Sequence, residues 1–312
     1  MPRAHALLAR LFDYAGVFAP ASLPLEQAIA RYAGYRAGSD AWMLGRFIVP
    51  AAQLDAFSAA ARPHLPRGAV AKCWRLSVLG GVDPQTDVAQ VSSFNRRHAD
   101  SSDGAAIVDT VELKVTSVDD VRAARVWASR GFEVFCECPV GDAMEGLLDA
   151  VARFGLHAKL RAGGTTADTV PSAAAVAQFL SASMARGIVS KATAGLHHAL
   201  TGAYPLTDAC DSVRTPMFGY LNLVLAAGIA EGAGRAAVQS GDVIATVERL
   251  LSVTEPPRLA GHSVIDWHGA HGPIIEGPLE PFAVSGRALV RSIGSCSFDQ
   301  PVAEARALGL VS

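Results

Sequence analysis

The chain has 312 residues, of which 50% are hydrophobic and 18% are charged. A chain of this size and composition can bury a large core, which excludes intrinsic disorder and a small fold held together by disulfides. Its formal net charge of −2 provides no positive field for a phosphate backbone, so we expect no nucleic-acid partner. A small molecule is the expected partner.

Cysteine usage and the apolar segments indicate a cytoplasmic protein without a membrane partner. The five cysteines are scattered and include no C-x-x-C pair, which is typical of a reducing compartment. The longest weakly polar stretch, residues 217–230, is interrupted by Asn222 and is shorter than the roughly 20 residues that span a bilayer. Arg10 and Asp13 interrupt the opening segment before it could act as a secretory signal.

From residue 46 onward, short segments with strand character alternate with amphipathic segments, as a parallel sheet with crossover helices requires. The clear strand candidates are residues 46–49, 74–79, 109–115, 133–138, 157–162 and 188–194, and two weaker ones are 263–267 and 287–292. The eight together predict one domain with a (β/α)8 TIM-type barrel fold. Its expected parts are an N-terminal helical extension (1–40) and the barrel (41–312), with an irregular C-terminal third. An open doubly wound sheet is the alternative, but no glycine-rich dinucleotide motif follows the first strand.

Cap residues support the helices between these strands. Ser117 with Asp120 three residues later resembles a capping box, and Gly131 stands where that helix should end. Ser172 after a proline predicts the start of another helix, and Gly187 its end. After residue 200 we expect an apolar helix at 217–230 and a further helix at 242–251.

Charged residues lie inside four neighbouring strand candidates, in pairs an even number of positions apart. The pairs are Glu112 and Lys114, Glu133 and Glu137, Lys159 and Arg161, and Lys191 with the polar Thr193. Because strand side chains alternate between the two faces of a sheet, the members of each pair point the same way. Ions of both signs can pair inside a barrel, whereas unpaired ions against apolar helices are costly. We therefore expect a shared cavity at the C-terminal ends of the strands, the usual active-site rim of barrel enzymes. Structural ion pairs are the alternative. The six residues expected at this cavity are Glu112, Lys114, Glu137, Lys159, Arg161 and Lys191.

The turns after the fifth and sixth strand candidates are rich in glycine and threonine. Adjacent Gly163 and Gly164 expose backbone amides, and Thr165 and Thr193 add hydroxyl groups. Such a turn could hold a carboxylate or phosphate beside Lys159 and Arg161, although a glycine pair also meets a simple turn requirement.

One short segment resembles a known family. Lys191-Ala192-Thr193-Ala194-Gly195 is similar to the K-T-S-T-G strand of the deoxyribose-phosphate aldolases, with Ala at two positions where that family has Thr. In those class I barrel enzymes the lysine forms a Schiff base with the substrate carbonyl. The resemblance implies that Lys191 is a covalent nucleophile, with Lys159 or Lys114 lowering its pKa and Glu137 moving a proton. The alternative is a charged Lys191 that binds the substrate anion.

Histidines offer a competing mechanism. We expect His197 or His198, after the sixth strand candidate, to act as a general acid or base, with at most one of them facing the pocket. Either could instead bind a divalent metal with Glu112 or Glu137, but no spacing matches a recognised ligand motif, so we expect no cofactor. A polar surface loop is expected to hold three further histidines, namely His262, His268 and His271.

The residues taken together predict an enzyme that acts on a small anionic carbonyl compound. It would be a lyase of the aldolase type, using a Schiff-base lysine, or an enzyme that enolises its substrate with acid and base groups. The alternatives are a metal-dependent hydrolase or isomerase and a non-catalytic ligand-binding or assembly protein on a barrel scaffold. In the last case, the apolar helix at 217–230 would pair subunits into a homo-oligomer.

Overall fold

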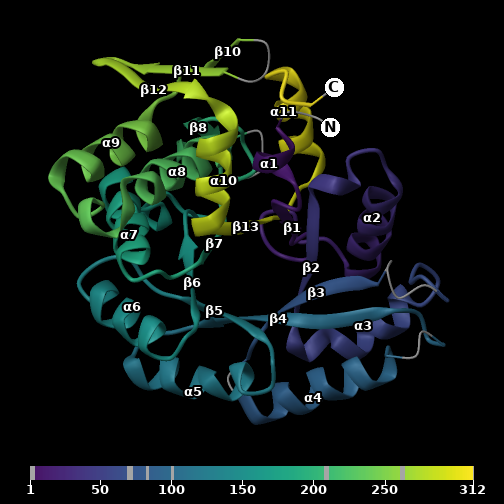
Figure 1. The fold of residues 1–312 in the computed structure, drawn as a ribbon. Coiled ribbons are helices and arrows are strands. Elements are labelled where there is room, and N and C mark those ends of the chain that lie inside the picture. Colours follow the sequence, from purple (N-terminus) through teal and green to yellow (C-terminus); the bar gives the residue numbers. More distant parts are fainter. Residues whose placement is uncertain are drawn as a thin grey trace.

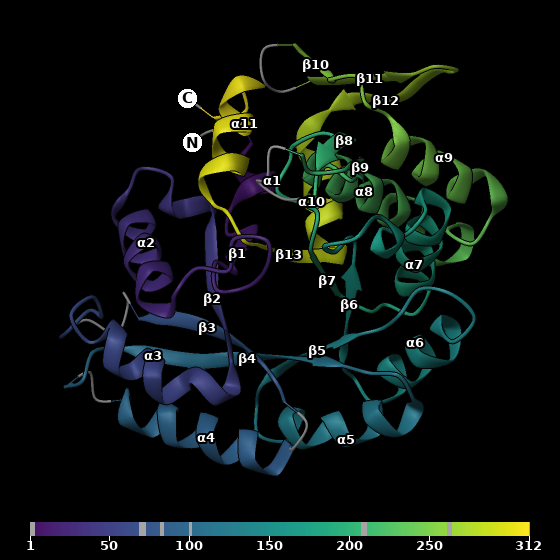
Figure 2. The same cartoon turned by 180° about the vertical axis from the view of Figure 1, so that it is seen from behind.

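The chain folds into a closed barrel of eight parallel strands, which confirms the predicted (β/α)8 architecture (Figure 1). This is a computed structural model, which describes residues 4–68, 73–81, 84–99, 102–206, 211–260 and 264–311. Around the barrel, hydrogen-bonded neighbours follow the order β1, β2, β3, β4, β5, β6, β7 and β13, and β13 pairs with β1 to close it. Helices surround the strands, as the view from behind also shows (Figure 2).

The barrel strands are short, and each is followed by a helix. The strands are β1 (Phe12–Tyr14), β2 (Leu44–Pro50), β3 (Trp74–Leu79), β4 (Ala106–Lys114), β5 (Glu133–Glu137), β6 (His157–Arg161), β7 (Ser190–Thr193) and β13 (Val290–Ser295). The outer helices are α2 (Leu25–Ala37), α3 (Leu54–Ala61), α4 (Pro84–Arg97), α5 (Val118–Ala128), α6 (Met144–Arg153), α7 (Ala173–Ala185), α8 (Tyr220–Ala237) and α11 (Asp299–Ala307). Helix α1 (His5–Leu8) precedes them, and 3-10 turns occupy Ala41–Met43, Ala51–Gln53 and Ala167–Thr169.

One predicted strand is wrong in place, one is displaced along the chain and one barrel strand was missed, although the total of eight is right. The first barrel strand is β1, which lies inside the segment predicted as a helical extension, so the barrel begins near residue 12 and not at 41. The candidate at 263–267 instead overlaps β11 (Val264–Gly269) of a peripheral antiparallel sheet. The candidate at 287–292 begins within α10 (Leu279–Leu289), and the strand there is β13.

The irregular C-terminal third is an insertion between β7 and β13. It contains a hairpin of β8 (Gly202–Pro205) and β9 (Arg214–Met217), helix α9 (Gly241–Ser252), and a sheet of β10 (Arg258–Ala260), β11 and β12 (Gly272–Pro278). Residues 217–230 lie mostly in α8, which packs against α7, α9 and α10 within the same chain. The apolar residues of this helix are therefore already buried within one chain, and the expected homo-oligomer stays a prediction. Within the described residues, no helix has the length and apolarity that crossing a membrane requires.

The predicted cap residues do what their positions indicate. Ser117 and Asp120 form a capping box at the start of α5, and Ser172 accepts a hydrogen bond from the amide of Ala175 at the start of α7. Gly131 and Gly187 both follow helices with positive φ values, of 85° and 66°. These local signals fix where the helices begin and end, and thereby the lengths of the loops that shape the barrel mouth.

Helices α8 and α10 approach each other closely at two glycines. A Cβ added at Gly228 would collide with the backbone oxygen of Phe282, and one added at Gly286 with that of Val224. We predict that Gly228→Ala and Gly286→Ala each lower the free energy of unfolding by about 1–3 kcal/mol through overpacking. Gly232→Ala, in the same helix α8 with open space around it, should raise it by up to about 1 kcal/mol. Urea unfolding measures all three, and equal effects at Gly228 and Gly232 would contradict the close packing.

Candidate active site

A cavity of about 340 Å³ opens at the C-terminal ends of the barrel strands. Strand residues form its floor, and the loops after β1, β6 and β7 form its walls. We call it the upper cavity. Among the charged residues predicted for the site, three line it, namely Glu112, Lys159 and Arg161.

Six ionic side chains form a continuous row below and beside the upper cavity, with signs that alternate. In order the row is Arg161, Glu137, Lys159, Glu112, Lys191 and Asp13. Each consecutive pair is 2.6–2.8 Å apart. The row carries three positive and three negative charges, so it is neutral as a whole. Such pairing is what allows ions to remain inside a barrel.

Glu112, on β4, is the centre of the row. Its Oε1 lies 2.6 Å from Lys191 Nζ and accepts a hydrogen bond from Ser77 Oγ, while its Oε2 lies 2.8 Å from Lys159 Nζ. Burial alone would raise the pKa of Glu112, but the two ammonium groups outweigh burial and hold that pKa well below its usual range. Glu112 is therefore an anion at neutral pH and acts as an anchor for both lysines.

Lys191, on β7, lies deeper than the resemblance to the aldolases implies. Its side chain is 1% exposed and does not line the upper cavity. Burial lowers the pKa of Lys191, but the carboxylates of Asp13 and Glu112 outweigh burial and raise it above the ordinary value. The expected lowering of this pKa by a neighbouring lysine is therefore wrong. The ring of Phe135 lies 5.5 Å from its Nζ and further stabilises the ammonium form.

Lys159 and Arg161, on β6, are the cations that reach the upper cavity. Lys159 Nζ lies 2.8 Å from both Glu112 Oε2 and Glu137 Oε2. Arg161 donates from Nε to Glu137 Oε1 at 2.8 Å, and its side chain is 43% exposed. Burial would raise the pKa of Glu137, but Lys159 and Arg161 lower it. Glu137 is therefore a carboxylate that fixes both cations, which is a different role from the predicted proton shuttle.

The other predicted residues divide between the upper cavity and its surroundings. Lys114 is exposed and lines a neighbouring groove with Glu137 and Arg161 instead of the upper cavity. His197 lines the upper cavity, whereas His198 turns away and lies 2.8 Å from Glu304 Oε1. Only one histidine of this pair thus faces the pocket, as the alternation of an extended chain predicts.

The glycine and threonine turns contribute to the cavity wall in part. Gly164, Thr165 and Thr193 line the upper cavity. Gly163 does not, and a Cβ there would lie 3.2 Å from the Cα of Gly195. Gly163 therefore allows the loops after β6 and β7 to pack closely, which is a structural role and not that of an anion cradle.

Three polar residues were missed in the sequence, namely Asp13, which completes the row, and Ser77 and Ser292, which donate hydrogen bonds to its carboxylates. Asp13 Oδ2 lies 2.6 Å from Lys191 Nζ and accepts from Ser292 Oγ, and its Oδ1 accepts from the backbone amide of Arg46. The signal for Asp13 is a single acid within the apolar run Leu11–Tyr14. Cys296 also lines the upper cavity. His262 lies outside the described residues.

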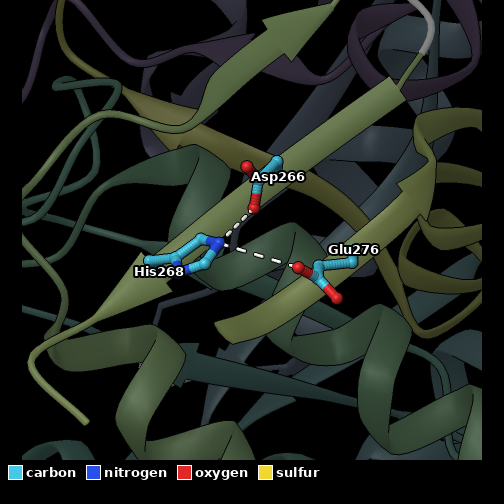
Figure 3. Close-up of side chains that lie close together, drawn as sticks. All are labelled: Asp266, His268 and Glu276. Atoms are coloured by element: carbon cyan, nitrogen blue, oxygen red, sulfur yellow. Dashed lines mark ion pairs between the residues drawn. The ribbon is translucent and has the colours of Figure 1, made fainter. Parts of the chain in front are cut away.

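One group of side chains could hold a metal ion, but it lies on the peripheral sheet (Figure 3). Asp266 and His268 on β11 and Glu276 on β12 place their ligand atoms within 4.8 Å of one another. His268 Nε2 is 2.5 Å from Asp266 Oδ1, and the three side chains are 35–64% exposed. His268 is thus in a strand and not in the predicted loop, whereas His271 is in the turn that follows. Among the described residues, no comparable group of three lies at the upper cavity.

The fold and the site define a TIM-type barrel with a neutral ionic row beneath a cavity at its C-terminal mouth. Comparison with known proteins finds no family model that matches the chain, and no curated protein matches it either. The resemblance of residues 191–195 to the deoxyribose-phosphate aldolases stays a prediction.

We predict that Asp13→Asn strongly destabilises the fold, because it removes one of the two carboxylates that neutralise the buried Lys191. Loss of one partner of a buried ion pair costs about 3–5 kcal/mol. The matched control is Asp119→Asn, which removes the exposed pair with Arg122 and should cost less than about 1 kcal/mol. Urea unfolding at neutral pH measures both, and equal small losses would show that the row contributes little to stability.

The lowered pKa values of Glu112 and Glu137 also predict how stability changes with pH. A carboxyl group whose pKa is lower in the folded than in the unfolded chain stabilises the fold above its unfolded pKa, which is about 4.3. That stability is lost as the pH falls through the folded pKa. We expect the unfolding free energy to fall below about pH 4.3, and to fall less steeply in Glu112→Gln. Glu145→Gln, at an exposed carboxylate, should leave the slope unchanged.

Proposed function

We propose that this chain is an enzyme that enolises a small anionic carbonyl compound in the upper cavity, as a lyase or an isomerase. The observation that carries the proposal is the placement of Lys159 and Arg161. Both line the cavity, and both are held by carboxylates from neighbouring strands. Cations fixed in this way are suited to bind oxygen atoms on which negative charge develops.

The lining of the cavity supports a small anionic substrate with an apolar part. Within the row, Arg161 contacts Glu137 only through Nε. The outer edge of its guanidinium group can therefore bind a carboxylate or phosphate group of the substrate. Apolar side chains also line the cavity, among them Phe18, Leu206 and Met217. A volume of about 340 Å³ lies near the lower end of the range of small-molecule sites.

The reaction step follows from these groups. His197 is the basic group in the wall and takes a proton from the carbon next to the substrate carbonyl. The electron pair of that C–H bond forms a C=C bond, and the carbonyl π pair moves onto oxygen, where the Lys159 ammonium stabilises the negative charge. In a substrate with a hydroxyl group on the deprotonated carbon, the hydroxyl proton moves to the enolate oxygen and the carbon-bound proton returns to the former carbonyl carbon, so the carbonyl and hydroxyl groups exchange places and the substrate is isomerised. Cleavage or formation of a C–C bond at the same enolate is the lyase outcome.

A Schiff base is the second form of this chemistry, and the position of Lys159 favours that residue over Lys191 for it. An amine must lose its proton before it attacks a carbonyl carbon, and water then leaves as the imine forms. For Lys159 the proton acceptors are Glu112 and Glu137, each 2.8 Å away. Lys191 does not touch the cavity, and its raised pKa keeps it protonated.

Exchange of substrate hydrogen with solvent tests the proposal. We expect the protein to catalyse deuterium incorporation next to the carbonyl of at least one compound in a panel of 2-oxo acids and phosphorylated ketones, measured by proton NMR in D₂O. Lys159→Met should reduce the exchange by about 10²–10³-fold, and His197→Asn by about 10²–10⁴-fold. The control is Arg122→Met, which removes an exposed cation and should have no effect. Absence of exchange with every compound would favour a ligand-binding protein.

Borohydride trapping separates the two forms of the chemistry. An imine is reduced to a stable secondary amine, so mass spectrometry after treatment with substrate and borohydride would find the adduct on Lys159 if a Schiff base forms. We expect no adduct, because two carboxylates contact the Lys159 amine and favour its charged form in the enolisation route. An adduct on Lys191 would contradict the burial of that residue and support the resemblance to the aldolases.

A further inference from the structure

A second cavity, of about 540 Å³, opens at the opposite, N-terminal mouth of the barrel. We call it the lower cavity. Residues at the beginnings of strands line it, among them Arg46 on β2, Arg75 on β3 and Glu133 on β5. The enolisation chemistry of the upper cavity uses none of these residues.

The lower cavity carries an excess of positive charge. Five arginines line it, namely Arg10, Arg46, Arg75, Arg287 and Arg291. Three carboxylates line it as well, from Asp13, Asp109 and Glu133. Two positive charges therefore remain in excess, and Asp13 is in addition bonded to Lys191.

Three of the arginines share two carboxylates. Arg46 lies between Asp109 and Glu133, with Nε 2.6 Å from Asp109 Oδ1 and Nη2 3.2 Å from Glu133 Oε2. Arg75 also bonds Asp109, and Arg291 Nη1 lies 2.6 Å from Glu133 Oε1. This sharing fixes the guanidinium planes on rigid strands. The side chains of Arg75 and Arg291 remain 41% and 45% exposed, so part of each group is accessible from the cavity.

The other two arginines form no ion pair with any carboxylate in the described part of the chain. Arg287 is held by backbone oxygens of Leu7, Ala9, Val290 and Arg291, at 2.6–3.2 Å. Burial lowers its pKa to about 10, so it is still charged at neutral pH. Arg10 is exposed and adopts a positive φ of 51° at the cavity edge. Two full charges thus lie at the cavity without a counter-charge in contact among the residues that the structure describes.

We propose that the lower cavity is a binding site for a small phosphate-bearing anion. Guanidinium groups bind phosphate oxygens through pairs of parallel hydrogen bonds, and the excess of two positive charges matches a phosphate dianion. Ion pairs that served only to close the N-terminal mouth would be neutral with equal numbers of arginines and carboxylates, whereas five arginines and three carboxylates line this cavity. The excess of arginines and the open volume of the lower cavity therefore indicate that these residues bind a ligand as well as closing the N-terminal mouth of the barrel.

Binding of inorganic phosphate, measured by isothermal titration calorimetry on the full chain at about pH 8, tests this site. We expect the wild-type chain to bind phosphate, and Arg10→Gln and Arg75→Gln each to weaken the affinity at least tenfold. Arg10→Gln breaks no ion pair in the described residues, so its effect cannot be attributed to lost folding. The matched control is Arg62→Gln, which changes an exposed arginine outside both cavities and should bind as the wild type does.

A further variant separates the two cavities. Arg161→Gln removes the anion-binding arginine of the upper cavity and should leave phosphate binding at the lower cavity intact. The proposal would be overturned if Arg161→Gln lost phosphate binding while Arg10→Gln and Arg75→Gln bound phosphate normally, because that result would place the phosphate in the upper cavity. Absence of phosphate binding to the wild-type chain would overturn it as well. Neither result depends on whether the upper cavity catalyses enolisation.

Discussion

Ionic groups in the interior of a barrel must neutralise one another, because little water is present to do so. The row from Arg161 to Asp13 meets this constraint by strict alternation, so that each interior lysine contacts two carboxylates. Asp13, Glu112 and Glu137 also each contact at least two donors. A layer of branched apolar side chains would fill the same space at a lower desolvation cost. The ionic row instead holds two cations at the floor of the upper cavity in fixed positions, which is the preorganisation that charge stabilisation requires.

The same row separates two cavities that are each lined by more cations than carboxylates. Above it, Lys159 and Arg161 line the cavity with one carboxylate, Glu112, and a bound anion gains from the exposed edge of Arg161 and from Lys159. Below it, arginines outnumber carboxylates. Asp13 belongs to both regions, because it lines the lower cavity and bonds Lys191, which in turn bonds Glu112 at the upper cavity. Asp13, Lys191 and Glu112 therefore form a chain of contacts that connects the two mouths of the barrel.

Alternation of short strands and helices was sufficient to predict the barrel, and charges on one face of neighbouring strands were sufficient to predict five of the six members of the ionic row. The sixth predicted residue, Lys114, lies outside the row. What the sequence does not contain is a periodic signal for β1, whose three residues are too few to show alternation. Asp13 was missed for that reason, although it completes the row. Apolar and polar residues do alternate in the segment at 263–267, but they alternate in any strand with one exposed face. This pattern therefore cannot distinguish a peripheral antiparallel strand such as β11 from a barrel strand.

Depth within the barrel is the property that strand periodicity cannot supply. Lys159 and Lys191 are register partners on neighbouring strands, so a flat sheet would present both at one height. Barrel strands tilt by about 36° to the axis, and register partners therefore lie at different depths. Lys159 reaches the cavity while Lys191 lies beneath it, and the difference decides their chemistry. A lysine between two carboxylates with no access to substrate can only hold charge, whereas one at the cavity floor can bind oxygen or become a nucleophile. The short motif that resembles the aldolases thus marks the interior face of β7, and the neighbouring strand presents the accessible amine.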